Sequence, residues 1–314
     1  MTFINQLENL LEDKSEQTKK TYISRIVSIK KLIDYKPDDL KFIDESKKII
    51  KFIDTDDDLK LSTKKLNYIA LSVISELLNL KSKNTYHEKM MEFKNKNNTE
   101  RKNNLITDEI KQHWATFDEL REMYFKMPEE TDDDIQNKLI IALYVLQPPL
   151  RNDYANIRLF NRMARLDAGN HMIIKKNKIE LIINEHKTKE QFGSVSINYD
   201  VKTTPEIYRI LNKWLDVNDT KYLLIRTSTR RALTENDLSH LIPQIFEKYI
   251  NKHITIQLLR QIYETELQSS KEYNEMSMNE KDEIHKKLLH GSMVAQEYKK
   301  LNAKKRNSKE KKEV

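Results

Sequence analysis

Apolar side chains in the first ninety positions recur at the spacing of an α-helix, in which every third or fourth residue lies on the same face. One stripe begins with Phe3 and Leu7, and a second includes Ile26 and Ile29 in the stretch KKTYISRIVSIKKLIDY. Short polar breaks separate these stripes. The pattern therefore predicts four or five helices within residues 3–90.

From Trp114 onward the pattern is again mostly helical, with one exception. Residues 172–184 and 193–199 alternate between apolar and polar positions, which is typical of β-strands, and Lys-Thr-Lys-Glu-Gln lies between them. Helical spacing then resumes and continues to His290. The predicted fold is mainly α-helical, with a small antiparallel β-sheet in the second half of the chain.

Changes in polarity divide the chain into four parts. Residues 93–113 are polar and rich in lysine and asparagine, which is typical of a linker with some helical character. This linker separates a helical N-terminal domain, residues 1–92, from a mixed α+β domain, residues 114–303. Residues 304–314 form a charged tail that we expect to be disordered.

Composition narrows the classes of protein. Charged residues make up 33% of the 314 positions, and the formal net charge of +7 fits either a well-solvated helical surface or a polyanionic partner. The 3 glycines disfavour a glycine-rich nucleotide fold, and the absence of cysteine excludes disulfides and thiolate metal sites. Since the sequence shows no signal peptide and no apolar run of the ~20 residues that a membrane span needs, we expect an intracellular protein without membrane contact.

Five polar residues in the second half of the chain could together perform one reaction. Two arginines can bind a phosphate and neutralise developing charge, a lysine can protonate a leaving oxygen, and a tyrosine can be the nucleophile. A histidine can add a phosphate ligand or an acid–base group. These residues are Arg151, Lys187, Arg260, His290 and Tyr298. The set predicts metal-free attack on a phosphodiester.

Several of these residues also have a purely structural interpretation. Arg151 follows two prolines and precedes Asp153, to which it could simply be tied. Arg260 lies in an apolar helix, where a charge is expensive unless it is paired or faces a cavity. Lys187 is preferred to Lys189 as the proton donor because it follows the predicted strand more closely. The functional interpretation therefore requires that the fold bring these residues together.

The histidines give no sequence signal for a metal site. His171, His253 and His285 show no ligand spacing with carboxylates. His290 ends an amphipathic helix, where the helix dipole also favours an imidazolium. Tyr298 has charged neighbours, which are unusual around a core aromatic residue. We therefore expect neither a metal ion nor another cofactor.

These blocks resemble the tyrosine recombinases, also called phage integrases. PPLRNDYANIRL, around Arg151, resembles the block of the first catalytic arginine, and HKTKEQFG, around Lys187, resembles the hairpin with the catalytic lysine. QLLRQIYETEL, around Arg260, resembles the second-arginine block, and LLHGSMVAQEY resembles the block that ends on the nucleophilic tyrosine. EQTKKTYISRIVSI near the N-terminus resembles the core-binding domain that clamps DNA, so the resemblance covers nearly the whole chain.

Three positions depart from the usual pattern of that family. Gln257 stands where the family mostly has histidine or lysine; it can hydrogen-bond a phosphate, but it cannot carry charge or relay a proton. Leu289 replaces the usual glycine before His290. The interval from His290 to Tyr298 is also shorter than in many bacterial members. The amino-acid sequences of these blocks resemble those of recombinases from large DNA viruses, virophages and eukaryotic mobile elements.

The resemblance implies a site-specific recombinase or integrase that cuts and rejoins double-stranded DNA through a 3′-phosphotyrosyl intermediate, without metal or ATP. It also implies a homotetramer on DNA, located in the host nucleus or a viral factory. Further DNA contacts are expected from four basic residues: Lys19, Lys20, Arg25 and Lys189. Two alternatives remain, namely an enzyme like the type IB topoisomerases, which act as monomers, and a catalytically inactive DNA-binding protein on the same fold.

Overall fold

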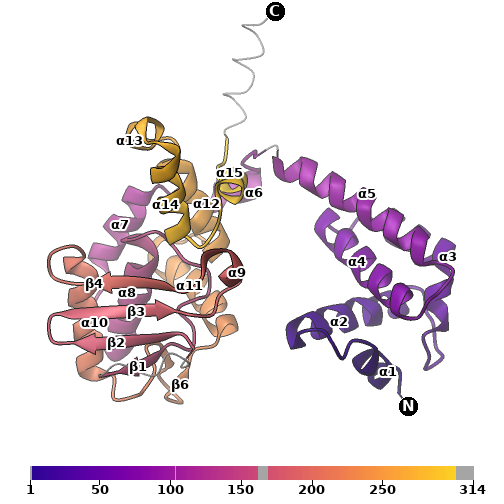
Figure 1. Ribbon diagram of the computed structural model, residues 1–314, viewed down its shortest axis with the longest axis horizontal. Coiled ribbons are helices and arrows are strands. Elements are labelled where there is room, and N and C mark those ends of the chain that lie inside the picture. Colours follow the sequence, from indigo (N-terminus) through magenta and orange to yellow (C-terminus); the bar gives the residue numbers. More distant parts are fainter. Residues whose placement is uncertain (1, 103, 162–168, 302–314) are drawn as a thin grey trace, which may run out of the picture. The chain divides into compact units, whose positions relative to one another are not determined.

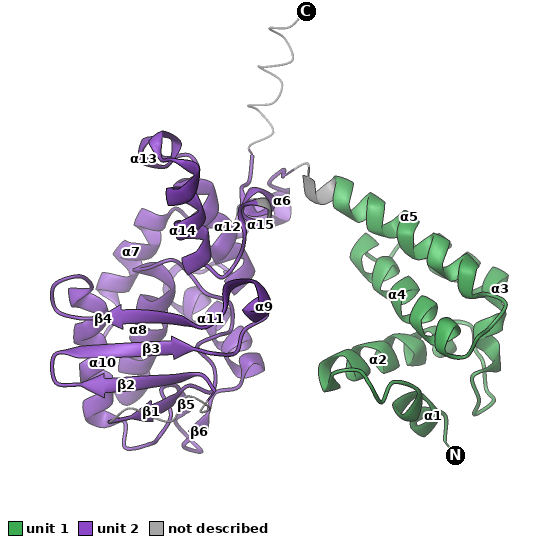
Figure 2. Cartoon of the chain, viewed as in Figure 1, with its two compact units in different colours: residues 1–103 green, residues 104–314 purple. Residues whose placement is uncertain are grey.

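The computed structural model describes residues 2–102, 104–161 and 169–301. The chain divides into two compact units, residues 1–103 and residues 104–314, which are coloured separately in Figure 2. Each unit has its own apolar core. The units are therefore described one at a time.

The stretch predicted as a linker, residues 93–113, is mostly helical. Its first part completes α5 (Lys83–Lys102) of the first unit, and its last part forms α6 (Asp108–His113) of the second unit. The crossing between the units lies within this stretch, at the boundary between residues 103 and 104. The predicted tail, residues 304–314, lies outside the described residues.

The first unit is a set of helices around one core, as the apolar periodicity predicts. Ile26 and Ile29, from one predicted stripe, are buried in this core together with Ile49 and Ile53. The buried hydroxyl of Tyr86 donates a hydrogen bond of 2.7 Å to the backbone carbonyl of residue 43, so the core also satisfies its polar groups. The helices labelled in Figure 1 are α1 (Phe3–Leu10), α2 (Glu16–Leu32), α3 (Ser46–Thr55), α4 (Leu61–Leu77) and α5. The short 3₁₀ helix η1 (Lys41–Asp44) precedes α3.

The second unit combines helices with a small sheet, which confirms the predicted fold class. Its helices after α6 are α7 (Phe117–Lys126), α8 (Asp132–Val145), α9 (Lys189–Phe192), α10 (Pro205–Val217), α11 (Glu235–Ile250), α12 (Ile256–Leu267), α13 (Lys271–Glu275), α14 (Met278–Lys287) and α15 (Ser292–Tyr298). Its strands are β1 (Arg158–Phe160), β2 (His171–Lys175), β3 (Lys178–Ile183), β4 (Val195–Tyr199), β5 (Ile225–Arg226) and β6 (Arg231–Ala232).

The main sheet has the strand order β1-β2-β3-β4 (Figure 1). The predicted antiparallel pairing is present between β2 and β3 and between β3 and β4, while β1 adds a parallel pair with β2. The stretch 172–184 turns back on itself at residues 176–177 and supplies two strands, β2 and β3. The connection between β3 and β4, predicted as a hairpin turn, contains the short helix α9.

The core of the second unit is formed by residues of the sheet and of the helices α7, α8, α10, α11 and α12. In the view of Figure 1, α8 lies behind the sheet. Every residue of α8 from Leu139 to Val145 is buried, and Trp214 of α10 is also fully buried. The indole N–H of Trp214 donates a hydrogen bond of 2.6 Å to the carbonyl of Leu223. No helix in the described part of the chain has both the length and the apolar character needed to cross a bilayer.

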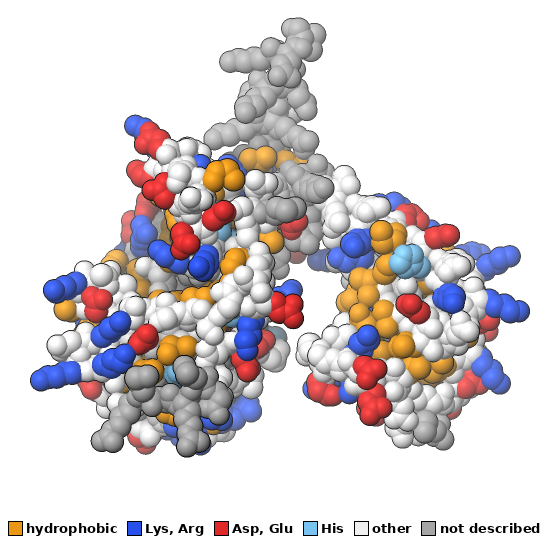
Figure 3. Space-filling model, viewed as in Figure 1, with side chains coloured by type: hydrophobic (Ala, Val, Ile, Leu, Met, Phe, Trp, Pro, Cys, Tyr) orange, Lys and Arg blue, Asp and Glu red, His pale blue; other side chains and the backbone are white. Residues whose placement is uncertain are grey.

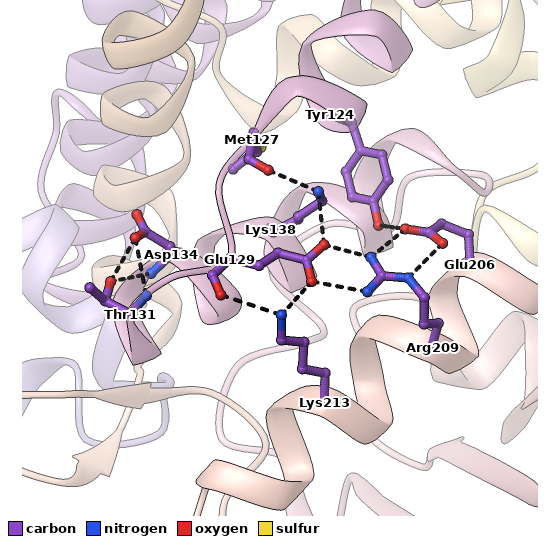
Figure 4. Close-up of polar contacts among 9 residues, drawn as sticks. All are labelled: Tyr124, Met127, Glu129, Thr131, Asp134, Lys138, Glu206, Arg209 and Lys213. Carbon is purple, nitrogen blue, oxygen red and sulfur yellow. Dashed lines mark hydrogen bonds and ion pairs between the residues drawn. The ribbon is translucent and has the colours of Figure 1, made fainter.

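An ion-pair cluster fixes the connection between α7 and α8 to α10 (Figure 4). The carboxylate of Glu129 contacts Lys138 at 2.9 Å, Arg209 at 2.6 Å and Lys213 at 2.7 Å. The Lys138 side chain is only 7% exposed, and its ammonium group also donates to the carbonyl of Met127 at 2.9 Å. The hydrogen bonds from Arg209, Lys213 and Lys138 hold the pKa of Glu129 well below its usual range despite its burial.

We expect Glu129→Gln to lower the free energy of unfolding of the second unit by about 3 kcal/mol at pH 7, because it leaves Lys138 buried without its anion. Arg209 and Lys213 are 45% and 40% exposed, so solvent screens their pairs with Glu129 and they add less. Both tryptophans of the chain, Trp114 and Trp214, lie in the second unit, so tryptophan fluorescence during urea unfolding reports on this unit.

The contribution of Glu129 to the stability of the second unit depends on pH. The pKa of Glu129 is lower in the folded state, so its stabilisation is present above the unfolded pKa of about 4.3 and is lost as the pH falls below it. The difference between wild type and Glu129→Gln should therefore shrink in acid. The control is Glu122→Gln on α7, which breaks an exposed pair with Lys126 and should cost less than about 1 kcal/mol. Equal urea midpoints for Glu129→Gln and Glu122→Gln would show that Glu129 does not stabilise the second unit more than an exposed ion pair does.

Candidate active site

Arg260 is a buried arginine whose guanidinium is held from three sides. It lies on α12, whose first turn is capped by the side chain of Thr255, and it is 1% exposed. Its Nη1 donates to the carbonyl of Pro149, and its Nη2 donates to the carbonyl of Leu288 at 3.1 Å and to His290 Nδ1 at 2.6 Å. Burial lowers the pKa of Arg260, although arginine keeps its charge in proteins. The structure thus fixes a buried positive charge that has no hydrogen bond to a carboxylate among the described residues.

Arg151 is a half-buried arginine in the turn that follows α8. Its Nη1 donates to the carbonyl of Leu289 at 3.0 Å. The neighbouring Asp153 accepts from the backbone N–H of Arg151 at 3.0 Å, and the hydroxyl of Tyr144 donates to the Arg151 carbonyl at 2.5 Å. Asp153 and Tyr144 therefore fix the backbone, while the guanidinium is bound elsewhere.

Both arginines are bound by consecutive carbonyls of the turn between α14 and α15, at Leu288 and Leu289. Leu289 has a φ of 54°, in the left-handed region that favours glycine. A glycine would adopt this backbone conformation without strain. In this chain, burial of the Leu289 side chain offsets the strain of its positive φ. The Leu289 carbonyl also accepts from the hydroxyl of Thr188 at 2.9 Å, so the same turn binds the β3–α9 connection.

His290 is buried at the centre of this arrangement, with an exposure of 1%. Its Nε2 lies 2.8 Å from Oε1 of Glu264, a fully buried carboxylate on α12. Gln268 donates to the other Glu264 oxygen at 2.8 Å, and Nδ1 of His285 lies 3.3 Å from Oε1 without the alignment of a hydrogen bond. Burial by itself raises the pKa of Glu264, but its contacts with His285, His290 and Gln268 lower the pKa to about 2.

The contacts determine the protonation of His290. Burial lowers the pKa of His290, and the nearby Arg260 lowers it further, although Glu264 opposes both. A neutral imidazole has one donor and one acceptor nitrogen. Since Arg260 can only donate and an ionised Glu264 can only accept, we assign the proton to Nε2 and the lone pair to Nδ1.

The same side chains are the one group among the described residues with the composition of a metal site. The ligand atoms of Glu264, His285 and His290 lie within 4.8 Å of one another. However, a neutral imidazole that binds a metal through Nε2 carries its proton on Nδ1, and in His290 this proton would point at the N–H of Arg260. The hydrogen-bond pattern therefore fits a proton between His290 and Glu264 better than a metal ion.

Tyr298 ends α15 and lies against both His290 and Arg260. Its ring is stacked on the imidazole of His290, with 5.4 Å between the ring centres and 29° between the planes. The guanidinium carbon of Arg260 lies 5.2 Å from the centre of the Tyr298 ring. The side chain is half-buried, so its polar neighbours in the sequence do not place it in open solvent.

The segment around Tyr298 is bound to the body of the second unit on both sides. Before Tyr298, the buried Ala295 accepts a hydrogen bond of 2.9 Å from the Gln268 side chain. After it, the backbone N–H of Leu301 donates to the backbone carbonyl of Asn104 at 2.7 Å, and the N–H of Ile106 donates to the Leu301 carbonyl at 3.3 Å. The backbone on both sides of Tyr298 is therefore hydrogen-bonded to the second unit of the same chain.

A surface pocket of about 460 Å³ opens beside these groups. Its lining includes both arginines and the tyrosine; the full set is Arg151, Asn152, Ser239, Thr255, Ile256, Gln257, Arg260 and Tyr298. Gln257 is exposed and lies one helical turn before Arg260. The pocket thus presents two guanidinium groups, an amide and a phenol to a ligand.

The remaining predicted residues lie outside the pocket lining. Lys187 is exposed in the turn between β3 and α9, directly before Thr188, and Lys189 is the first residue of α9. Three lie on α2 in the first unit: Lys19 pairs with Glu16 at 3.0 Å, Lys20 is exposed, and Arg25 is half-buried. The structure therefore brings together four of the five predicted catalytic residues and places Lys187 next to a residue that contacts their turn.

The sequence interpretation missed Glu264 and His285. The signal for Glu264 is its spacing of four residues from Arg260, which puts two charges on one face of an apolar helix. The sequence shows no carboxylate at ligand spacing from His285, because its partner Glu264 lies on a different helix. Only the packing of α12 against the α14–α15 turn brings these residues together.

Comparisons with known proteins identify the fold. No protein-family model matches the chain, and no curated protein matches it in sequence. The XerH site-specific recombinase bound to difH substrate, in a pre-cleavage complex, aligns with a TM-score of 0.55 and 14% identity over 93% of this chain and 82% of that chain. The XerH post-cleavage complex with a palindromic difH substrate gives a TM-score of 0.53 and 15% identity over 94% of this chain and 80% of that chain. The chain therefore has the tyrosine recombinase fold.

Proposed function

We propose that this protein is a site-specific DNA recombinase or integrase that cuts and rejoins DNA through a 3′-phosphotyrosyl intermediate. The observation that carries the proposal is the pocket onto which Arg151, Arg260 and Tyr298 all open. Two guanidinium groups beside a phenol suit the attack of the phenol on a phosphodiester. The fold supports the proposal, because the two similar XerH structures are complexes with a recombination substrate before and after cleavage.

In the proposed reaction, the hydroxyl oxygen of Tyr298 attacks the phosphorus of the DNA backbone. A bond forms between this oxygen and phosphorus, and the bond from phosphorus to the 5′ oxygen breaks. Lys187 gives the leaving oxygen a proton, so that a 5′-hydroxyl is released. The N–H groups of Arg151 and Arg260 stabilise the charge on the non-bridging oxygens. One phosphodiester replaces another, so the reversal of the same step rejoins the strand without ATP.

The proposed partner is double-stranded DNA. On the face shown in Figure 3, basic and acidic side chains are interspersed over both units, so the net charge of +7 does not form a single basic field there. We therefore assign the phosphate contact to the pocket, with additional contacts from Lys19, Lys20, Arg25 and Lys189. Exchange of strands between two duplexes needs four cuts, so we propose a homotetramer on DNA, located in the compartment that holds the target DNA, such as a host nucleus or a viral factory.

The wild-type protein should form a covalent complex with DNA in the presence of EDTA, because the proposed reaction uses no metal. The substrate is a pool of nicked duplexes with randomised sequence, from which the protein selects its target. Release of a short fragment traps the cut strand. Products are separated on a denaturing gel, and we expect a protease-sensitive band in which the protein is linked to the 3′ end created by the cut. Sequencing of that band then gives an enriched duplex.

The outcome distinguishes the alternatives. A covalent band with joining of two enriched duplexes supports a recombinase, whereas relaxation of supercoiled plasmids without strand exchange would support an enzyme like the type IB topoisomerases. DNA binding without a covalent band across the pool would support an inactive DNA-binding protein. Cleavage that EDTA abolishes would indicate a metal-dependent nuclease.

A further inference from the structure

Glu264 is a buried carboxylate that has no role in the proposed cleavage steps. It lies four residues after Arg260 on α12, is 0% exposed, and accepts a hydrogen bond of 2.8 Å from His290. We propose that Glu264 is a positioning residue that holds His290 as the acceptor of the proton that Tyr298 loses when it attacks. This inference rests on the proposed function, because it accounts for the proton of the attacking hydroxyl.

The wall of the pocket offers no acceptor for this proton. Among the described residues that line it, none is a carboxylate, a histidine or a lysine. Gln257 has an amide, which does not take up a proton near neutral pH. His290 lies against the Tyr298 ring at 5.4 Å and has a nitrogen lone pair. It is therefore the group that the structure places to accept the phenolic proton.

Glu264 determines which nitrogen of His290 has this lone pair. The ionised carboxylate accepts the N–H of Nε2, which leaves the lone pair on Nδ1. Its negative charge also stabilises the imidazolium that forms when Nδ1 takes up a proton. A buried aspartate acts on the histidine of Ser-His-Asp enzymes in the same way. Burying Glu264 is costly, and Gln268 and His290 offset this cost with hydrogen bonds.

Arg260 connects proton acceptance to DNA binding. In the structure, its Nη2 donates to Nδ1 of His290 at 2.6 Å and so occupies the lone pair. A bound phosphate competes for this donor, and the lone pair becomes free when the guanidinium turns to the phosphate. The phenol, now stacked on the face of the imidazole, must then shift to its Nδ1 edge. The proton passes from the Tyr298 oxygen to Nδ1 as the oxygen–phosphorus bond forms, and it returns when the strand is rejoined.

The neighbouring charges define the expected pH dependence. The charged and titratable groups around the Glu264–His290 pair come from several elements: Arg260 on α12, His285 on α14, Tyr273 on α13 through its hydrogen bond to His285, Tyr298 on α15, and Arg151 after α8. Glu264 stays ionised at neutral pH because its pKa is about 2. The rate of cleavage should therefore fall in acid as His290 becomes protonated, and this should occur below the usual range of histidine because burial lowers the pKa of His290.

The test is Glu264→Gln, assayed on the enriched nicked duplex as single-turnover formation of the covalent complex. Loss of an effective proton acceptor should slow the reaction by about 10²-fold at pH 7. The defect should shrink as the pH rises, because hydroxide in solution can then take up the phenolic proton in place of His290. Placing a fluorinated tyrosine with a more acidic hydroxyl at position 298 should restore most of the lost rate. A merely structural role would give neither the pH dependence nor the rescue.

The matched control is Glu266→Gln, the same change two residues later on the same helix. Glu266 is half-buried and accepts from the backbone N–H of Phe117 at 2.7 Å, a bond that glutamine can keep. We expect it to cleave at the wild-type rate. The inference is overturned if Glu264→Gln matches this control, or if it is slowed equally at every pH and with either form of Tyr298. If the wild type forms no covalent complex, the proposed function itself has failed.

A measurement without any change at Glu264 keeps the inference testable even if that variant does not fold. The fluorinated tyrosine is placed at position 298 of the otherwise wild-type protein, and the rate is followed from pH 4.5 to 9, a range chosen to bracket about two units either side of the usual histidine pKa. If His290 accepts the proton, the acid limb of the profile keeps its midpoint. A midpoint that moves with the acidity of the phenol would show that the tyrosine ionises without His290 and would overturn the inference.

Discussion

Tyr298→Phe should abolish the covalent complex with DNA, a loss of at least ~10⁴-fold in rate, because it removes the attacking oxygen. The ring contacts to His290 and Arg260 do not require the hydroxyl, so the fold and the pocket should persist. The measurement is the covalent band on the enriched nicked duplex, together with DNA affinity in the same buffer. We expect binding to be retained and the band to disappear.

The matched control is Tyr263→Phe, which removes the hydroxyl of another half-buried tyrosine in the same unit. Tyr263 packs edge-on against Phe117, with ring centres 5.4 Å apart, and does not line the pocket. Its variant should cleave like the wild type. A covalent band that persists in Tyr298→Phe would assign the nucleophile to a different side chain.

Arg151→Ala should slow formation of the covalent complex by about 10³-fold, the loss expected when a preorganised donor to developing charge is removed. The backbone bonds of Arg151 to Asp153 and Tyr144 do not depend on its side chain, and the Leu289 carbonyl keeps its bond from Thr188. The thermal midpoint should therefore change little while the rate constant falls.

The control is Arg158→Ala, which removes an exposed arginine of β1 that does not line the pocket. Both variants lose one positive charge, so any general weakening of DNA attraction affects them equally. The comparison is made at saturating DNA, where differences in affinity no longer influence the rate. Equal rates for the two variants would remove Arg151 from the proposed mechanism.

Local sequence signals account for most of the helices. Amphipathic spacing locates α2 and α12, and the Thr116 hydroxyl caps α7 by accepting from the backbone N–H of Glu119 at 3.2 Å. Local sequence signals predict the sheet less completely than the helices. The two-residue reversal between β2 and β3 carries no glycine or proline, and β1 joins the sheet through a parallel pairing that local alternation does not encode.

Sequence signals also identify only part of the candidate site. Arg151, Arg260, His290 and Tyr298 were identified because each stands in a recognisable sequence block, and the pocket and its neighbouring contacts bring them together. Glu264 is not identified, because its spacing of four residues from Arg260 places it on the same helix face but does not show which residue it contacts. Its role depends on a contact with His290 across 26 positions of the chain, which exists only after α12 packs against the turn before α15.

The bonds between Leu301 and residues 104–106 have a mechanical consequence. Residue 104 begins the second unit directly after the boundary, and its side chain also donates to the carbonyl of Gln296 within α15 at 2.8 Å. Three hydrogen bonds thus join the entry point of the chain to both ends of the tyrosine segment. We therefore expect a displacement of residue 104 to be transmitted through these hydrogen bonds to the segment that carries Tyr298.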